Sequence, residues 1–437
     1  MEEKAVPILD TGPIDNRRAP RTTQLSIRLS NTGRVPAIAG IEAYHVNPAG
    51  DGFAGKTFYL LRLISLNPLG IAGSEHAVDP LFADLDVFGV RIITSGQGGN
   101  DIAATITEFG ADGQVIKEHM LTGELARIQE NNLAYASGGG AITVINTGTS
   151  EVLAKISFPA GSDPRGMALT PDGTRLYAAN FGTPSQISVI DTATNAILAT
   201  IPLLPGSMPG QIAMTPDGSR AYVNLFGTPD AVAVIDTVTN TVVATIPLPN
   251  GSDPADLAIT PDGTRAYVAT IGVNQDAVWV IDTASNAILT TISFPPASSP
   301  IAIAMAPDGL RAYVAVFNTS SIEVIDTITN AVSATISLPA GTNPIDIAIT
   351  PDGSRLYVSN FAMNTLTVVN TLANSVQSVI TLPISSRTVG ITPDGSQAYV
   401  GLTSDTVLVI DTSSNAIVAE LPAVEPIQIA FTPIFLT

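Results

Sequence analysis

Cysteine is absent from the 437-residue sequence, which excludes disulfides, thiol nucleophiles and zinc–thiolate sites. Basic residues are also scarce: 19 of them face 38 acidic residues, and the formal net charge is −19. A chain this acidic is a poor candidate for binding nucleic acid or anionic lipid. Charged residues make up only 13% of the sequence and hydrophobic residues 45%, so we expect a large buried core.

Histidine and long apolar runs are equally rare. The three histidines, His45, His76 and His119, all precede residue 131, so the rest of the chain lacks a Ser-His-Asp triad and a histidine base or metal ligand. No apolar run approaches the roughly 18 residues of a membrane span, and the N-terminus lacks the features of a secretory signal. These absences predict a non-enzymatic protein with no catalytic residues, no cofactor and no metal.

What the sequence does contain is a repeat of four short strand-like runs. The third run of each unit ends at intervals of 41 to 46 residues, at Asn146, Asp191, Asp236, Asp282, Asp326, Asn370 and Asp411. A tyrosine marks the second run of the same seven units, at Tyr135, Tyr177, Tyr222, Tyr267, Tyr313, Tyr357 and Tyr399. This period and content predict an all-β fold with a seven-bladed β-propeller.

The ends of the repeat predict how the ring closes. The repeat begins near residue 131 with a run of the second type and ends with a run of the first type at 426–433. We therefore expect one blade to combine residues 132–158 with 426–432, which pairs the C-terminal inner strand with the N-terminal blade. Five arginines recur just after the Pro-Asp-Gly turns, and they predict Asp–Arg pairing or, alternatively, a charged ring that binds an anion: Arg175, Arg220, Arg265, Arg311 and Arg355.

The region before the repeat divides into two parts. Residues 22–125 contain several alternating strand-like runs without a helical period, which predicts a jelly-roll-like β-sandwich. Residues 1–21 form an arm that carries Arg17, Arg18 and Arg21. The arm is either a mobile tail or an extended segment that docks on the sheet edge of a neighbouring subunit. The propeller then takes residues 126–437.

Short motifs of the repeat resemble those of a known family. Arg265–Thr270, Val234–Thr237 and Ile259–Gly263 resemble the YVTN-type repeats of surface-layer-like propellers, and the resemblance covers about residues 131–433. The stretch Phe82–Phe88 resembles a domain of surface proteins in Gram-positive spore formers. The resemblance implies a scaffold at the cell or spore surface, such as a spore coat or exosporium. A cytoplasmic location is the alternative.

Function is expected in the connections that do not repeat, since loop variation over a fixed scaffold is a usual source of specificity. The candidate partner-binding residues in these loops are Ser162, Asp163, Thr183, Gln186, Asp230, Ser252, Asp253, Asn274, Asp276, Asn318, Asn343 and Asn364.

Three functions remain open. The first is a non-catalytic structural protein that binds protein partners or itself, as a homo-oligomer, fibre or array. In this case the propeller is a stable display or binding scaffold, and the N-terminal domain serves anchoring or self-assembly. The second is a module that binds a glycan or a protein. The third, a lactonase-like hydrolase, is disfavoured because no cluster of histidine, glutamate and arginine recurs in the loops.

Overall fold

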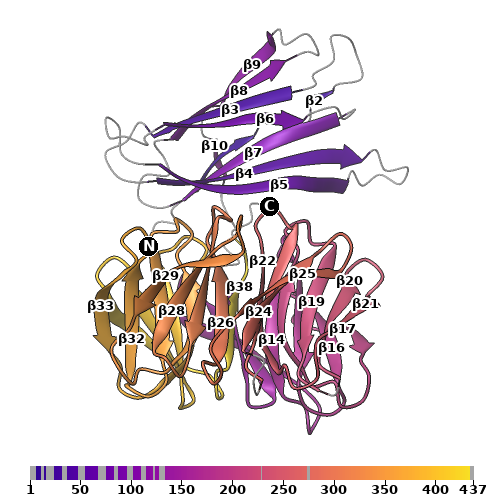
Figure 1. The fold of residues 1–437 in the computed structure, drawn as a ribbon. Helices are drawn as coiled ribbons and strands as arrows, with labels where there is room; N and C mark the ends of the chain where they lie inside the picture. Colours follow the sequence, from indigo (N-terminus) through magenta and orange to yellow (C-terminus); the bar gives the residue numbers. More distant parts are fainter. Residues whose placement is uncertain are drawn as a thin grey trace. The chain divides into compact units, whose positions relative to one another are not determined.

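The fold is that of a computed structural model, which describes residues 133–227, 229–272 and 276–433, together with the strands of the first 126 residues. The chain separates into two compact units, one of residues 1–129 with the last two residues and one of residues 130–435. The second unit is the propeller (Figure 1). No described helix is long and apolar enough to cross a membrane.

The strands of the first unit form two sheets. The larger sheet has the order β10-β1-β7-β4-β5, with β2 paired to β7, and the smaller has the order β6-β3-β8-β9. The strands are β1 (Val6–Asp10), β2 (Ile14–Asp15), β3 (Gln24–Asn31), β4 (Ala37–Asn47), β5 (Gly55–Leu66), β6 (Glu75–Phe82), β7 (Val87–Ser95), β8 (Ile102–Phe109), β9 (Val115–Leu121) and β10 (Glu124–Ala126).

Part of the predicted arm belongs to the larger sheet. Strand β1 pairs with β10 and with β7, and β2 pairs with β7, all antiparallel. These pairs use the chain's own sheet rather than that of a neighbour. Arg17, Arg18 and Arg21 lie outside the described residues, so their docking role stays a prediction, as does the jelly-roll topology.

Seven four-stranded antiparallel sheets form the propeller, which confirms the predicted number of blades. In chain order of the blades, the inner strands are β38 (Gln428–Phe431), β14 (Pro164–Leu169), β18 (Pro209–Met214), β22 (Pro254–Ile259), β26 (Pro300–Met305), β30 (Pro344–Ile349) and β34 (Ser386–Ile391). The second strands, which carry the seven tyrosines, are β11 (Leu133–Gly138), β15 (Arg175–Asn180), β19 (Arg220–Leu225), β23 (Arg265–Thr270), β27 (Arg311–Val316), β31 (Arg355–Asn360) and β35 (Gln397–Leu402).

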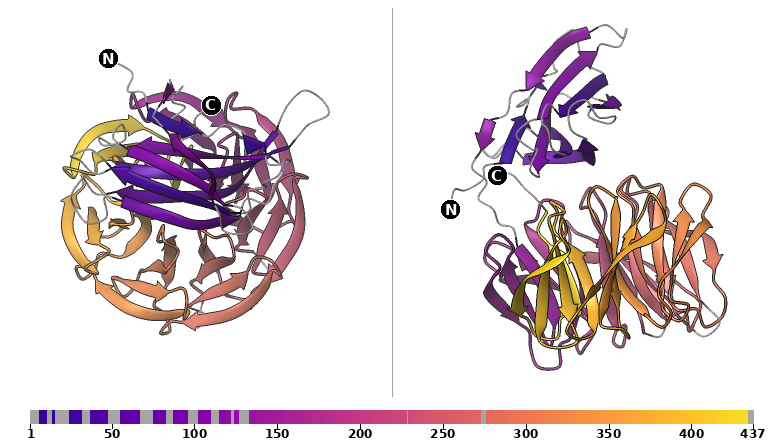
Figure 2. Two further views of the ribbon diagram at one scale, coloured as in Figure 1. Left: turned by 90° about the horizontal axis from the view of Figure 1, so that it is seen from above. Right: turned by 90° about the vertical axis from the view of Figure 1, so that its left-hand side faces the viewer.

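The outer half of each blade completes its sheet. The third strands are β12 (Ala141–Asn146), β16 (Gln186–Asp191), β20 (Ala231–Asp236), β24 (Ala277–Asp282), β28 (Ser321–Asp326), β32 (Thr365–Asn370) and β36 (Thr406–Asp411). The outer strands are β13 (Glu151–Ser157), β17 (Ile197–Pro202), β21 (Thr241–Pro247), β25 (Ala287–Ser293), β29 (Ala331–Ser337), β33 (Ser375–Thr381) and β37 (Ala416–Pro422). Figure 2 shows the blades arranged in a ring around a central axis.

The first blade draws on both ends of the propeller sequence. Strand β38 pairs antiparallel with β11, with Tyr135 opposite Ala430, so three strands from residues 133–157 share a sheet with one from 428–431. The inner strand of every blade thus corresponds to the first run of the sequence repeat. A C-terminal strand in the first sheet leaves that sheet without an unpaired inner edge.

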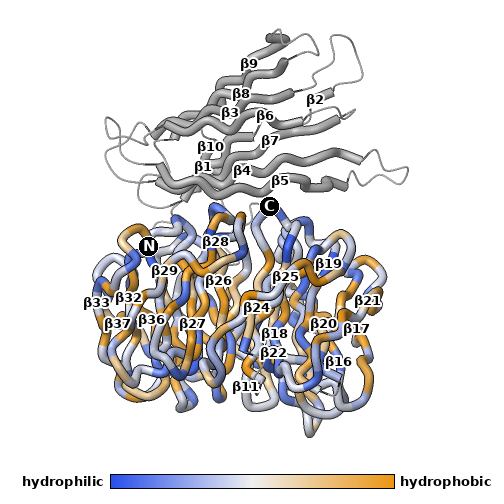
Figure 3. Tube along the Cα trace, viewed as in Figure 1, coloured by the Kyte–Doolittle hydropathy of each residue, from blue (hydrophilic) through white to orange (hydrophobic). Residues whose placement is uncertain are grey.

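Burial explains why hydrophobic and polar residues do not alternate along the middle strands of the blades. The second and third strands are buried along most of their length, while the outer strands are mostly exposed. Both faces of a middle strand pack against neighbouring blades, so Val, Ile and Ala occupy both faces instead of alternating with polar residues. The seven tyrosines are the largest fully buried side chains of the described residues. Along the trace, hydrophobic residues follow the strands and hydrophilic ones gather in the connections at both ends of the blades (Figure 3).

The connections divide between two ends of the ring. In the fourth blade, Pro254 pairs with Thr270, which pairs with Ala277, which in turn pairs with Ser293. These residues flank the longer connections, and we call this end of each blade the loop end. The opposite turn end carries the Pro-Asp-Gly turns and the turns after the third strands. Five asparagines of the turns after the third strands have a left-handed backbone, with φ between 52° and 59°: Asn195, Asn240, Asn286, Asn330 and Asn415.

Within the described part of the chain, the repeated arginines do not form the predicted Asp–Arg ion pairs. Each donates from Nη1 to the main-chain carbonyl of the threonine that follows the third strand of the next blade. The pairs are Arg175–Thr237 at 3.5 Å, Arg220–Thr283 at 3.1 Å, Arg265–Thr327 at 2.7 Å, Arg311–Thr371 at 2.9 Å, and Arg355–Thr412. The arginines therefore join neighbouring blades at the turn end.

Candidate functional site

One equivalent position of the inner strands carries several polar residues; it is the third residue of β14, β18, β22, β26, β30 and β34 and the first residue of β38. In blade order from the second blade, the residues at this position are Gly166, Gln211, Asp256, Ala302, Asp346, Thr388 and, from the first blade, Gln428. Five of these residues line one cavity of about 530 Å³, whose walls are otherwise the apolar residues of the same strands. We call this cavity the channel.

Asp256 is one of two carboxyl groups in the channel. Its Oδ1 accepts a hydrogen bond from the main-chain nitrogen of Leu257 at 2.8 Å, and its Oδ2 accepts one from Ile303 of the next blade at 2.8 Å. The pKa of Asp256 is raised to about 8, chiefly by burial and also by the negative charge of Asp346, although the two N–H donors lower it. At neutral pH this carboxyl group is mostly protonated.

Asp346 has the same bonding pattern two blades further on. Its Oδ1 accepts from the nitrogen of Ile347 at 2.8 Å and its Oδ2 from Val389 at 2.9 Å. Burial raises its pKa to about 6, while the Thr388 hydroxyl and the two N–H donors lower it. Two chemically identical groups in one cavity thus titrate on opposite sides of neutrality, which is the pattern of an acid and a base.

The two glutamines of the ring differ in their bonding. Gln428 Oε1 accepts a hydrogen bond from the main-chain nitrogen of Met167. Gln211 Oε1 is buried and has no hydrogen-bond partner within the described part of the chain. A buried carbonyl oxygen without a donor is costly, so Gln211 is suited to receive a donor from a bound molecule.

The predicted site residues lie instead at the loop end, and several hold the loops together. The buried carboxylate of Asp230 accepts from the nitrogen of Ser252 at 2.9 Å, and Asp276 accepts from Ser298 in the same way at 2.9 Å. Burial raises the pKa of Asp253, and the charge of Asp230 adds to the effect. Oxygens occupied in this way position the loops.

Two further candidate residues, Ser162 and Asp163, lie directly before the inner strand of the second blade. Asp163 accepts from Arg165 Nε at 2.8 Å, and the guanidinium of Arg165 lies 3.8 Å from the ring centroid of Phe181. Ser162 donates its main-chain N–H to Pro159, and its hydroxyl has no partner among the described residues.

The remaining candidates are distributed around the loop end. Thr183 donates its N–H to Gly161, and Gln186 begins the third strand of its blade. Asn318 donates to the carbonyl of Ala297 at 2.9 Å, and Asn343 and Asn364 have positive φ values of 49°. Asn274 lies outside the described residues. A partner-binding role for the candidate residues stays a prediction.

The channel carboxylates were not among the predicted site residues, because the sequence pattern favoured the irregular loops as the place of function. The sequence does contain an indication of these carboxylates. Two inner strands have the pattern P-x-D-hydrophobic, in which an aspartate occupies the position that is glycine or alanine in two other blades. Among the described residues, no group of three or more histidine, aspartate or glutamate side chains could hold a metal ion.

Part of the propeller sequence matches the model of a known protein family. Residues 211–416, less than half of the chain, match the model of the family described as "Lactonase, 7-bladed beta-propeller". No curated protein matches the chain. The match with a hydrolase family contradicts the prediction of a non-catalytic surface protein and the prediction that the protein is not an enzyme. The match also makes the alternative of a glycan- or protein-binding module less favoured. The surface location, the partners and the YVTN-type assignment stay predictions.

Solved structures show the same fold at low identity. Hydrazine synthase of Kuenenia stuttgartiensis is 21% identical with a TM-score of 0.56, over 72% of this chain and 93% of that one. A protein of unknown function from Desulfotomaculum acetoxidans is 19% identical with a TM-score of 0.58, over 69% and 99%. A candidate 6-phosphogluconolactonase of Bacteroides fragilis is 17% identical with a TM-score of 0.58, over 70% and 99%. Residues 130–435 thus form a seven-bladed β-propeller, and its third to seventh blades are similar to the lactonase family.

Proposed function

We propose that the protein is a hydrolase that opens a cyclic ester in the channel, with Asp346 as general base and Asp256 as general acid. The observation that carries the proposal is the pair of carboxyl groups with separated pKa values on one cavity. The similarity of residues 211–416 to the lactonase family supports the choice of a lactone as substrate. The segment that matches this family includes both aspartates.

Each group has a defined task in this reaction. Asp346, ionised at neutral pH, takes a proton from a water molecule as the water oxygen attacks the lactone carbonyl carbon. The ring C–O bond then breaks, and the leaving oxygen takes the proton of Asp256, which gives a hydroxy acid. The main-chain N–H donors on both carboxyl groups fix their orientation, and Gln211 Oε1 accepts a hydroxyl of the substrate.

The pH dependence of the rate follows from the two pKa values. Activity should rise as the pH passes about 6, where Asp346 loses its proton, and fall above about 8, where Asp256 loses its proton. The two groups interact, so the limbs of this bell-shaped profile report apparent values of the pair.

The test is the hydrolysis of small lactones, such as δ-valerolactone and glucono-δ-lactone, followed by acid release in a pH-stat. Asp346→Asn and Asp256→Asn should each lower kcat by roughly 10²- to 10⁴-fold. The matched control is Asp308→Asn, since Asp308 is an exposed turn residue that does not line the channel. If both channel variants keep the rate of the unsubstituted protein, or if no lactone is hydrolysed, the proposal is wrong.

A further inference from the structure

The ionisable side chains that line the channel are carboxylic acids. Among the described lining residues they are Asp256 and Asp346, and none of the others is a lysine, an arginine or a histidine. Asp346 is the group that is ionised at neutral pH, as its role as a base requires. A molecule that enters the channel therefore meets a negative charge.

The basic residues of the described propeller lie elsewhere. The five repeated arginines bond to main-chain carbonyls at the turn end, and Lys155 belongs to the outer strand β13. Arg165 forms an ion pair with Asp163, and Arg387 precedes Thr388 on β34, where successive side chains point to opposite faces. Neither arginine lines the channel, so no described cation offsets the charge of Asp346 there.

Main-chain N–H groups around the channel are already bonded to its own side chains. Such groups can hold an anion where basic side chains are absent. Three of them donate to a side chain of the preceding blade: Ile303 to Asp256, Val389 to Asp346 and Met167 to Gln428. The nitrogens of Leu257 and Ile347 donate to the two aspartates within their own strands. These five donors are therefore not available to an anionic ligand.

This bonding pattern also explains the unpartnered oxygen of Gln211. Gln211 lies one blade before Asp256 at the same inner-strand position, so its matching donor is the nitrogen of Leu257. That nitrogen donates to Asp256 Oδ1 at 2.8 Å, and Gln211 Oε1 has no partner in the described part of the chain. An oxygen acceptor suits a hydroxyl group of a ligand and repels a phosphate or carboxylate oxygen.

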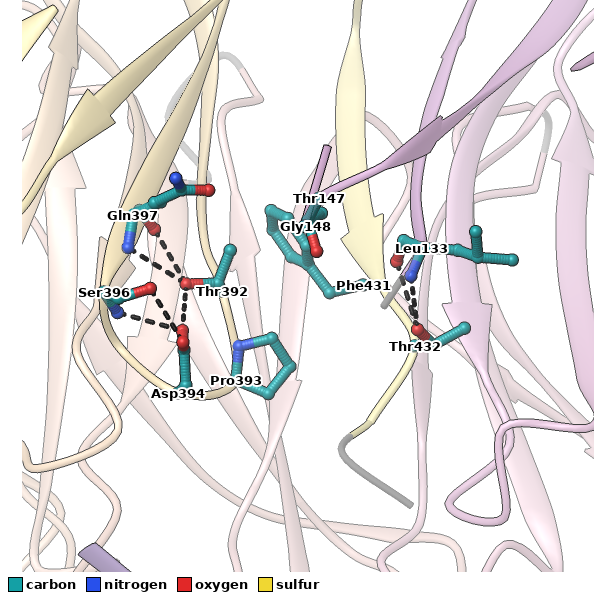
Figure 4. A pocket seen from close by; sticks show the side chains of 10 residues that line it. All are labelled: Leu133, Thr147, Gly148, Thr392, Pro393, Asp394, Ser396, Gln397, Phe431 and Thr432. Atoms are coloured by element: carbon teal, nitrogen blue, oxygen red, sulfur yellow. Dashed lines mark hydrogen bonds between the residues drawn. The ribbon is translucent and has the colours of Figure 1, made fainter. Parts of the chain in front are cut away.

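A smaller cavity of about 220 Å³ lies beside the channel, at the boundary of the seventh and first blades (Figure 4). Pro393 and Phe431 line both cavities. Asp394 is the ionisable residue among its described lining residues, and its Oδ1 accepts from the Thr392 hydroxyl at 2.6 Å and from the nitrogen of Ser396 at 3.0 Å. The space next to the channel thus adds a third carboxyl group.

We propose that the channel selects uncharged lactones over anionic ones, with Asp346 as the residue that repels the anion. This inference rests on the function proposed above and defines the substrate class. A phosphate or carboxylate group on the lactone would bring a second negative charge close to Asp346, where protein replaces part of the water that screens such repulsion. At neutral pH, kcat/KM should be roughly 100-fold higher for an uncharged lactone than for the phosphorylated form of the same ring.

The hydrolysis of glucono-δ-lactone and of its 6-phosphate by the unsubstituted protein tests the proposal. Acid release is followed in a pH-stat at neutral pH, and the rate without protein is subtracted for each compound. A strong preference for the uncharged lactone is expected. Equal kcat/KM values, or a preference for the phosphate, would overturn this inference and leave the hydrolase function standing. If neither compound is hydrolysed, the proposed function fails and this inference fails with it.

Two further measurements identify charge as the cause of the preference. Added NaCl should raise kcat/KM for the phosphorylated lactone and leave that of the uncharged one nearly constant, because salt screens the repulsion. Gln428→Lys places a cation in the lining and should reduce the preference at least about tenfold. Asp308→Asn makes the same change in net charge at an exposed turn and should leave the preference unchanged. A preference that responds neither to salt nor to Gln428→Lys would refute the role of Asp346.

Discussion

Two tyrosines in equivalent positions should respond in opposite ways to loss of their hydroxyl groups. Tyr267 is fully buried and donates to Asn330 Oδ1 at 2.6 Å. Tyr135 is equally buried, but its hydroxyl has no partner in the described part of the chain, and neither does Asn195 Oδ1 at the corresponding position of the next blade. Burial raises the pKa of Tyr135, so the hydroxyl stays neutral at any physiological pH.

The magnitudes follow from these contacts. Tyr267→Phe removes a hydrogen bond and leaves Asn330 Oδ1 buried without this donor, so the free energy of unfolding should fall by about 1–3 kcal/mol. Tyr135→Phe removes a buried polar atom that forms no hydrogen bond. The free energy of unfolding should therefore stay the same or rise by up to about 1 kcal/mol. Both substitutions conserve the aromatic ring that packs between blades, so the packing contribution is equal in the two variants.

Urea unfolding followed by tryptophan fluorescence measures both effects. The single tryptophan, Trp279, lies in the third strand of the fourth blade, so its emission reports on the propeller. The expected result is a lower midpoint for Tyr267→Phe and an unchanged or higher one for Tyr135→Phe, at equal m-values. An equal loss of stability in both variants would refute the reasoning, since it would mean that the Tyr135 hydroxyl is bonded in solution.

Three further predictions concern stability. Folding raises the pKa of Asp256 from 3.8 to about 8, so the contribution of its protonated form to stability is complete below about pH 4 and is lost as the pH rises to about 8. Between these two pH values, the urea midpoint should therefore change less with pH in Asp256→Asn than in the unsubstituted protein. Asp230→Ala should cost about 1–3 kcal/mol in urea unfolding, because the buried nitrogen of Ser252 loses its acceptor. Asn286→Ala should destabilise more than Asn286→Gly, since both lose the bond from Tyr222 at 2.8 Å but only glycine tolerates a φ of 55°; equal midpoints would contradict this.

The number of blades could be read from the sequence because it depends on local patterns. Each blade contains its own tyrosine, and the second to seventh blades each contain a Pro-Asp-Gly turn and an asparagine such as Asn286 that tolerates a left-handed backbone. Turn geometry and strand pairing within a blade join residues that are close in sequence. A repeated pattern then reveals them seven times over.

The partners of the repeated arginines could not be read in this way. Arg265 has aspartates near it in the sequence, and an ion pair was the natural expectation. In the structure it bonds to Thr327, 62 residues away, because the start of its strand lies beside the end of the third strand of the next blade. That choice depends on how two blades pack.

The proposed active site depends on packing even more strongly. Asp256 and Asp346 are separated by 90 residues and by a whole blade, and each by itself resembles an ordinary polar residue in a strand. The sequence alone determined the repeat, the turns and the all-β class, since these follow from short-range preferences. Only the packed ring brings Asp256 and Asp346 into one cavity, where loss of solvent raises the pKa values of both carboxyl groups to the neutral range.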